Sequence, residues 1–173
     1  PAGQCLLAGE RGGDPIPGFD LGNSPLEFVR ERVGGRVIVL TTTNGTGAML
    51  AAAPAAAVGV AALTNVAAAA RWSVARGTDL TLLCAGERGG FCLEDAVCAG
   101  LVVEAIASDG AGELRFTDAA VAARRWAGAY AGRLERLIED AAWARHLRKA
   151  GRAADFAACL ALSTADQVPV LTG

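Results

Sequence analysis

Several residue types are scarce in this chain, and each scarcity excludes a class of protein. The 173 residues contain one histidine and five cysteines without a Cys-x-x-Cys pair, so a zinc site of the usual cysteine–histidine kind is not expected. No apolar run approaches the roughly 18 residues that span a bilayer, and no secretory leader is visible. We therefore expect no membrane partner and a reducing, cytoplasmic location, where free cysteines are common.

A large excess of charge of either sign is also missing. The 16 basic residues face 18 acidic ones, and the formal net charge is −2. Proteins that bind nucleic acid through bulk charge are strongly basic, so no nucleic-acid partner is expected. Lys149 is the only lysine, and the remaining basic residues are arginines. Arginine suits bidentate recognition of phosphate or carboxylate, although GC-rich codon usage explains the same bias.

The most informative stretch that is present is residues 36–46, RVIVLTTTNGT. Its apolar part, residues 37–40, is rich in β-branched side chains and predicts a strand buried on both faces. A short helix is expected at residues 48–53. Open α/β sheets bind anions at such strand-to-helix junctions, and an ordinary threonine-rich turn is the equally weighted alternative. The candidates for an anion site here are Thr43, Asn44, Gly45 and Thr46.

Expected strands alternate with expected helices along much of the chain. Strands are expected at residues 4–8, 37–40, 56–61, 79–85 and 168–171, and helices at 25–32, 48–53, 66–76, 93–108, 118–140, 141–150 and 153–162. This alternation predicts one α/β domain over residues 1–173, with a mostly parallel sheet and helices on both faces, a three-layer α/β/α arrangement. The C-terminal third is expected to be helical. A buried strand so early predicts that a strand-containing N-terminal segment is missing from this chain.

The sequence AGERGG occurs twice, at residues 8–13 and 85–90, each time after an expected strand. Right-handed crossovers place the exit loops of parallel strands at one edge of the sheet. We therefore expect both AGERGG loops and the TTNGT loop to converge on one cleft. Each copy offers a glutamate that can hold a metal and an arginine that can clamp an anion. Two exposed Glu–Arg pairs of little energetic value are the alternative.

Glu94 and Asp95 open the helix expected at residues 93–108, directly after the second AGERGG loop. Acidic residues in a first helical turn are favoured by the helix dipole, which is the simpler explanation. Mg²⁺ prefers one or two carboxylates together with substrate oxygens and waters. The two residues are therefore also candidate metal ligands.

Three segments in the same order resemble the 2-phosphosulfolactate phosphatase family: GERGG…GFDLGNSP (residues 9–25), TTNGT (42–46) and AGERGGFCLED…CAG (85–100). The resemblance covers nearly the whole chain. It implies Mg²⁺-dependent hydrolysis of 2-phospho-3-sulfolactate to 3-sulfolactate and phosphate, a step of coenzyme M biosynthesis in methanogens. The family pattern begins with a further strand that this chain does not contain.

The resemblance implies a role for each candidate residue. The residues expected to bind a small anionic phospho- or sulfo-organic acid are Arg11, Asn23, Ser24, Thr43, Asn44, Gly45, Thr46 and Arg88. The residues expected to act in catalysis and to hold Mg²⁺ are Glu10, Glu94 and Asp95. The alternatives are a non-catalytic α/β module that binds a phosphate or sulfonate metabolite, and a phosphatase for another phosphorylated hydroxy acid. A homo-oligomer is compatible with the sequence.

Overall fold

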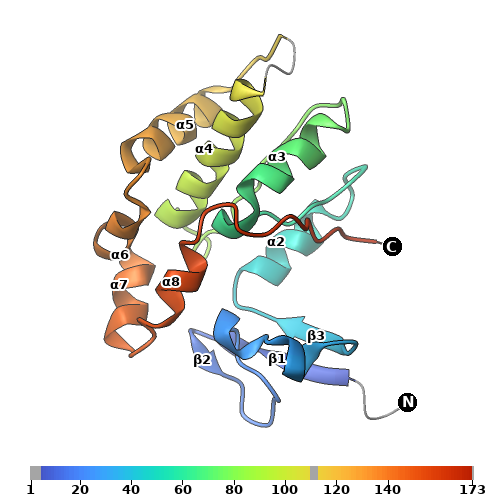
Figure 1. The fold of residues 1–173 in the computed structure, drawn as a ribbon, viewed down its shortest axis with the longest axis vertical. Coiled ribbons are helices and arrows are strands. Elements are labelled where there is room, and N and C mark those ends of the chain that lie inside the picture. The colour runs from blue at the N-terminus through green and yellow to red at the C-terminus, as the bar shows by residue number, and fades with distance from the viewer. Residues whose placement is uncertain (1–4, 110–112, 173) are drawn as a thin grey trace.

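A computed structural model of the chain describes residues 5–109 and 113–172. Its strands are β1 (Cys5–Arg11), β2 (Asp14–Pro15) and β3 (Val37–Thr41). Its α-helices are α1 (Arg30–Val33), α2 (Gly45–Ala52), α3 (Val66–Val74), α4 (Leu93–Ser108), α5 (Asp118–Tyr130), α6 (Leu137–Asp140), α7 (Ala142–Lys149) and α8 (Asp155–Cys159). Short 3-10 helices are η1 (Pro25–Glu27), η2 (Leu63–Asn65) and η3 (Leu134–Arg136). The sheet lies at one end of the molecule and α3, α4 and α5 pack together at the other (Figure 1).

β1 is the middle strand of a sheet with the order β2-β1-β3. It pairs in parallel with β3 and antiparallel with β2. Gly9 permits the close approach of β1 to β3, because a Cβ at this position would lie 2.1 Å from the carbonyl oxygen of Thr41. The parallel pair confirms the strands expected at residues 4–8, over the described residues 5–8, and at 37–40; residue 4 lies outside the described residues. The pairing places the exit loops of both strands at one edge of the sheet.

The mixed α/β class is confirmed, but the three-layer arrangement with a mostly parallel sheet is not. Residues 79–85 form no strand, and Leu83 is 56% exposed. Residues 56–61 and 168–171 meet only in an isolated bridge between Gly59 and Val170. An apolar run becomes a strand only where a neighbouring backbone completes its hydrogen-bond ladder. Within the described residues, nothing supplies that ladder to residues 79–85.

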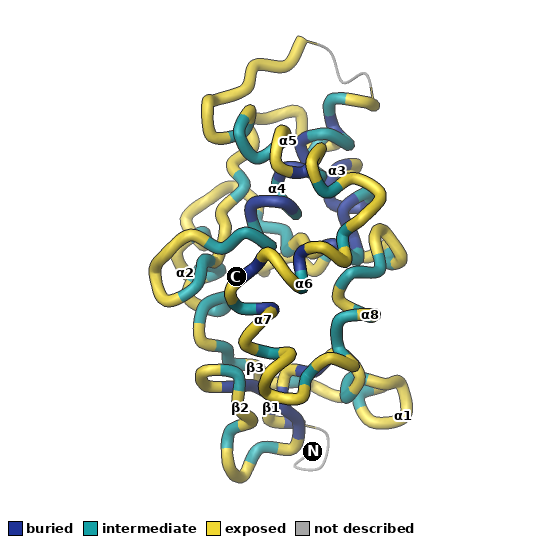
Figure 2. Tube along the Cα trace, turned by 90° about the vertical axis from the view of Figure 1, so that its left-hand side faces the viewer, coloured by how far each residue is buried: buried dark blue, intermediate teal, exposed yellow. Residues whose placement is uncertain are grey.

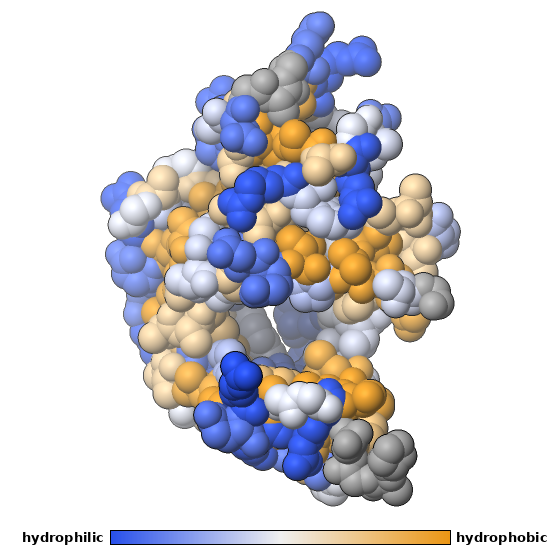
Figure 3. Space-filling view, turned by 45° about the vertical axis from the view of Figure 1, so that its right-hand side comes forward, coloured by the Kyte–Doolittle hydropathy of each residue, from blue (hydrophilic) through white to orange (hydrophobic). Residues whose placement is uncertain are grey.

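β3 forms the strand that its apolar residues predict, but the predicted burial on both faces is wrong. Val37 is 66% exposed and Val39 is 53% exposed. β1 pairs with one edge of β3, and no strand of the described chain pairs with the other edge. Figure 3 shows a hollow between the part of the molecule that carries the sheet and the part that carries the helices, with hydrophobic surface along its borders.

The hydrophobic core is divided between the sheet and the helices (Figure 2). A small cluster around Leu6 and Ala8 packs at the sheet. Among the helices, one cluster contains Val102 and another contains Val97 and Leu137. Both helical clusters include residues of α4, so this helix connects the α3 side of the core to the C-terminal helices.

The helical C-terminal third is confirmed as a series of short, separate helices that ends at Cys159. The helix expected at residues 118–140 is divided into α5, η3 and α6. Gly132, with φ +72°, lies in the left-handed region just after α5, where a helix ends readily. Ser24 caps η1, since its Oγ accepts a hydrogen bond from the N–H of Leu26 (3.3 Å). In the described part of the chain, no helix combines the length and apolar character needed to cross a membrane.

Candidate active site

The loops that leave β1 and β3 meet the second AGERGG loop and helix α7 around a cavity of about 150 Å³. The described residues that line it are Glu10, Gly12, Asn23, Thr42, Thr43, Asn44, Gly45, Glu87 and Trp143. The two AGERGG loops and the TTNGT loop therefore converge, as predicted, although the second AGERGG loop does not follow a strand. This cavity is the candidate active site.

Glu10 fastens the TTNGT loop to the first AGERGG loop. Its side chain is buried, and its Oε1 accepts a hydrogen bond from the N–H of Thr43 (2.6 Å). Its Oε2 accepts from the N–H of Gly13 (2.8 Å) and from the hydroxyl of Thr43 (2.9 Å). Burial raises the pKa of Glu10, but these hydrogen bonds and the nearby charge of Arg11 outweigh it and leave the pKa below its ordinary value. Glu10 is thus held as a carboxylate at the cavity wall.

Asn44 joins the TTNGT loop to the second AGERGG loop. Its Nδ2 donates to Glu87 Oε2 (2.9 Å), and its Oδ1 accepts from the N–H of Arg88 (3.3 Å). The other carboxylate oxygen, Glu87 Oε1, lies 3.3 Å from Nε of Arg88, whose side chain is 74% exposed. An exposed ion pair of this kind contributes little energy, so a ligand can displace Arg88 from Glu87.

Five predicted site residues line the cavity: Glu10, Asn23, Thr43, Asn44 and Gly45. Others make contacts beside it. Arg11 donates from Nη2 to Thr41 Oγ1 (2.8 Å), and Ser24 Oγ donates to Asp155 Oδ1 (2.5 Å). Thr46 Oγ1 donates to the carbonyl of Thr42 (3.1 Å) and so shapes the loop. These side chains and Arg88 surround the cavity without lining it.

Glu94 and Asp95 also lie outside the cavity lining, where they bind backbone N–H groups. Glu94 Oε1 accepts from the N–H of Ala144 at the start of α7 (3.3 Å). Asp95 Oδ2 accepts from the N–H of Gly86 (2.8 Å) and so holds the second AGERGG loop. Within residues 5–109 and 113–172, no group of three or more His, Cys, Asp or Glu is placed to hold a metal ion. Glu10, Glu94 and Asp95 therefore do not gather into one such group.

The cysteines near these acidic residues are not activated nucleophiles. Burial raises the pKa of Cys92 to about 12, and the hydrogen bond from its thiol to Glu94 (3.1 Å) acts in the same direction. Burial also raises the pKa of Cys98 to about 12. The thiolate is the reactive form of cysteine, so the site geometry does not favour covalent catalysis by either residue.

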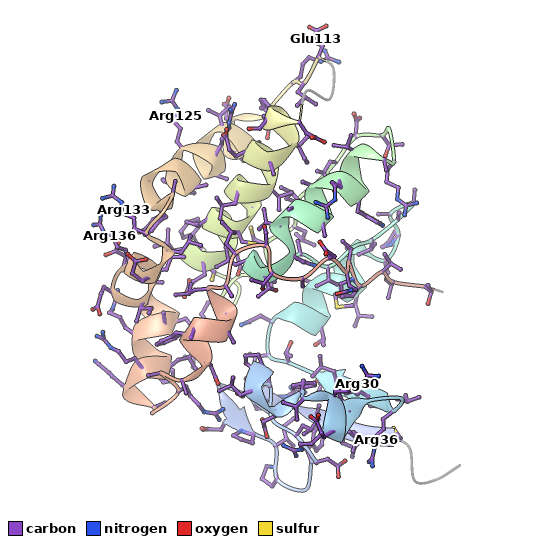
Figure 4. The ribbon with its side chains drawn as sticks, in the orientation of Figure 1. Arg30, Arg36, Glu113, Arg125, Arg133 and Arg136 are labelled. Atoms are coloured by element: carbon purple, nitrogen blue, oxygen red, sulfur yellow. The ribbon has the colours of Figure 1, made fainter. Side chains whose placement is uncertain are left out.

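The charge of the cavity is negative. Its described lining contains the carboxylates of Glu10 and Glu87 and no arginine, lysine or histidine. Figure 4 shows Arg125, Arg133 and Arg136 pointing outward from the helical side of the molecule. Carboxylate oxygens are the donors that Mg²⁺ prefers, and it binds through one or two of them plus substrate oxygens. Glu10 and Glu87 therefore fit a magnesium ion by their chemistry.

Glu87 and Trp143 also line the cavity. The AGERGG repeat offers Glu87 as a possible metal ligand, but neither residue is in the set of expected site residues. Glu87 had a signal, because it occupies in the second AGERGG copy the place that Glu10 occupies in the first. Trp143 had none. Its position depends on how α7 packs against loops more than 50 residues away in the chain, and no local motif encodes that contact.

A sequence model of the family described as 2-phosphosulpholactate phosphatase matches residues 1–173. The chain is 40% identical over 172 residues to a probable 2-phosphosulfolactate phosphatase of Symbiobacterium thermophilum, covering 99% of this chain and 73% of that protein. It is 42% identical over 172 residues to a protein of the same name from Thermus thermophilus, covering 98% and 71%. The resemblance drawn from the motifs is confirmed, and the chain belongs to the 2-phosphosulpholactate phosphatase family, a family of phosphoric monoester hydrolases.

Proposed function

We propose that this protein hydrolyses 2-phospho-3-sulfolactate to 3-sulfolactate and inorganic phosphate, with Mg²⁺ as its cofactor. Family membership supports the reaction class, and the names of the relatives support the substrate. One structural observation carries the proposal. A cavity of about 150 Å³ brings two carboxylates together with a Thr-Asn-Gly loop that can donate hydrogen bonds.

The need for a cation follows from the charge of both partners. The proposed substrate carries a phosphate, a sulfonate and a carboxylate, whereas the cavity presents Glu10 and Glu87. Like charges at close range in a partly buried site repel strongly. Glu10 and Glu87 would hold Mg²⁺, which when bound supplies polarisation of the phosphoryl group and neutralises part of its charge.

The remaining residues position and stabilise the substrate. Thr43, Asn44 and Gly45 line the cavity at the point where α2 begins, and helix N-termini favour anions. Arg88 lies next to Glu87 and is largely exposed, so its guanidinium can turn to a sulfonate or phosphate oxygen. Glu10 keeps the loop in place through its bonds to Thr43. The loop is thereby preorganised before the substrate arrives.

Removal of the metal tests the proposal directly. Phosphate release by the purified protein is measured with 2-phospho-3-sulfolactate, 2-phospholactate and phosphoglycerate, each with Mg²⁺ or with EDTA. We expect 2-phospho-3-sulfolactate to have the highest kcat/KM, and EDTA to lower its turnover by about 100-fold until Mg²⁺ is restored. Activity that EDTA leaves unchanged would contradict the role of the metal. Binding of the substrate without turnover would favour a non-catalytic module.

Replacement of Glu87 tests the carboxylate of the second AGERGG loop. The variant Glu87→Gln keeps a hydrogen-bond acceptor for Asn44 but loses the charge that would hold Mg²⁺. We expect kcat to fall by about 100-fold, with a weaker dependence of the rate on Mg²⁺ concentration. Glu135→Gln, at an exposed position on η3, serves as the matched control and should match the wild type. Wild-type kinetics in Glu87→Gln would remove this residue from the chemistry.

A further inference from the structure

We propose that Trp143 determines substrate specificity, by forming a fixed aromatic wall that restricts the cavity to small, acyclic phosphorylated acids. This inference rests on the proposed function, because it names the class of substrate that the same site accepts. Of the described residues that line the cavity, Trp143 alone contributes a large apolar side chain. It is also the only one that comes from the helical C-terminal third.

The indole packs directly against the first AGERGG loop. A Cβ at Gly13 would lie 3.4 Å from two indole carbons of Trp143 and 3.7 Å from Leu147. The loop backbone, rather than a mobile side chain, therefore supports this edge of the indole. His146 stacks on Trp143, with ring centroids 4.8 Å apart and planes 21° from parallel. The indole is confined between a backbone loop and a stacked ring.

Helix α7, which carries Trp143, is also fixed to the site. At its start, Glu94 accepts a hydrogen bond from the N–H of Ala144 (3.3 Å). Beyond its end, Arg152 donates from Nη2 to the carbonyl of Gly13 (3.2 Å). Ser24 donates to Asp155 at the start of α8 (2.5 Å). Because these contacts come from three separate segments, the helix cannot move away from the cavity without breaking several of them.

A fixed wall of this kind selects substrates by size. Polar groups of the cavity bind the charged ends of a short acid, while the indole packs against its carbon atoms and excludes water from that side. A phosphate ester with a ring as its alcohol portion would need the space that the indole occupies. A difference of as little as one methylene group in an apolar pocket changes kcat/KM by about 10- to 200-fold.

The test compares a small and a bulky substrate. The ratio of kcat/KM for p-nitrophenyl phosphate to that for 2-phospholactate is measured in the presence of Mg²⁺. We expect Trp143→Ala to raise this ratio by about 10-fold or more, and Trp143→Phe by less than about 3-fold. Trp126→Ala is the control, because Trp126 packs on Phe91 (ring centroids 5.2 Å apart) and does not line the cavity. An unchanged ratio in a folded Trp143→Ala variant would overturn the proposal.

A second measurement does not depend on turnover. The chain has three tryptophans, so Trp72→Phe with Trp126→Phe leaves Trp143 as the only indole. Addition of inorganic phosphate with Mg²⁺ should change its emission, at the concentrations at which equilibrium dialysis detects phosphate binding. Phosphate binding without an emission change would contradict the place of Trp143 in the site. If no phosphate ester is hydrolysed but the emission responds, the proposed reaction fails while the position of Trp143 is supported.

Discussion

Replacement of Glu10 with glutamine should lower kcat by about 1,000-fold and the free energy of unfolding by about 2–3 kcal/mol. The carboxylate accepts hydrogen bonds from the N–H of Thr43, the hydroxyl of Thr43 and the N–H of Gly13. Glutamine has the same shape, but its amide nitrogen is a donor and would face one of these donors. The loop then loses its attachment, and the cavity loses a carboxylate. Urea denaturation and steady-state kinetics measure the two effects.

The loss of unfolding free energy in Glu10→Gln should be larger at neutral pH than at acidic pH. Burial raises the pKa of Glu10, but its hydrogen bonds lower it further, so the net folded-state pKa lies below the ordinary value of 4.5. A carboxyl group with a lowered folded-state pKa stabilises the protein above the unfolded-state pKa, and this contribution is lost as the pH falls through the folded-state pKa. The difference in unfolding free energy between wild type and Glu10→Gln should therefore be full at pH 7 and shrink below 4.5.

The control for this variant is Glu31→Gln, at an exposed position on α1 at the same end of the molecule. Its unfolding free energy and its kcat should equal those of the wild type at each pH. A Glu10→Gln variant with wild-type stability would mean that the three hydrogen bonds do not hold the loop. A loss of stability that is equally large at pH 3 and pH 7 would contradict the assignment of Glu10 as an ionised carboxylate.

Local rules were sufficient to predict the loops of the site. An apolar β-branched run followed at once by TTNGT predicts a strand, a turn and a helix, and the structure has β3, the loop and α2 in that order. β1 also forms where a strand is expected, but it continues to Arg11, so only Gly12 and Gly13 of the first AGERGG segment form a turn, which leads into β2. Because both strands are parallel, their exit loops share one edge, and Glu10 meets Thr43 there. Residue type and strand direction were sufficient to predict this contact.

Burial and long-range contacts could not be predicted in the same way. Residues 79–85 have a strand-like apolar pattern, yet they form no strand, because a strand needs a paired neighbour as well as a pattern. Glu94 and Asp95 illustrate a second limit. Their place in the first turn of α4 is explained by the helix dipole and by backbone N–H groups that they bind. Sequence position alone did not distinguish these roles from metal binding.

Substitution of Gly100 with alanine should lower the free energy of unfolding by about 3 kcal/mol or more. Gly100 lies in α4 at its contact with α5, and a Cβ there would lie 2.0 Å from the carbonyl oxygen of Ala123. It would also lie 2.9 Å from the Cβ of Ala127. The obstructing atom belongs to the backbone, so a change of rotamer cannot relieve the overlap. The helices must separate, and separation exposes the surface that is buried between α4 and α5. Thermal and urea denaturation measure the loss.

Gly128→Ala is a matched control, because Gly128 lies on α5 and a Cβ there would meet nothing within 4 Å. Alanine favours the helix over glycine by about 1 kcal/mol at an exposed interior position, so this variant should be slightly more stable than the wild type. The two substitutions add the same methyl group to neighbouring helices and should change stability in opposite directions. If Gly100→Ala were also stabilising, α4 and α5 could not pack with their backbones in contact at this point.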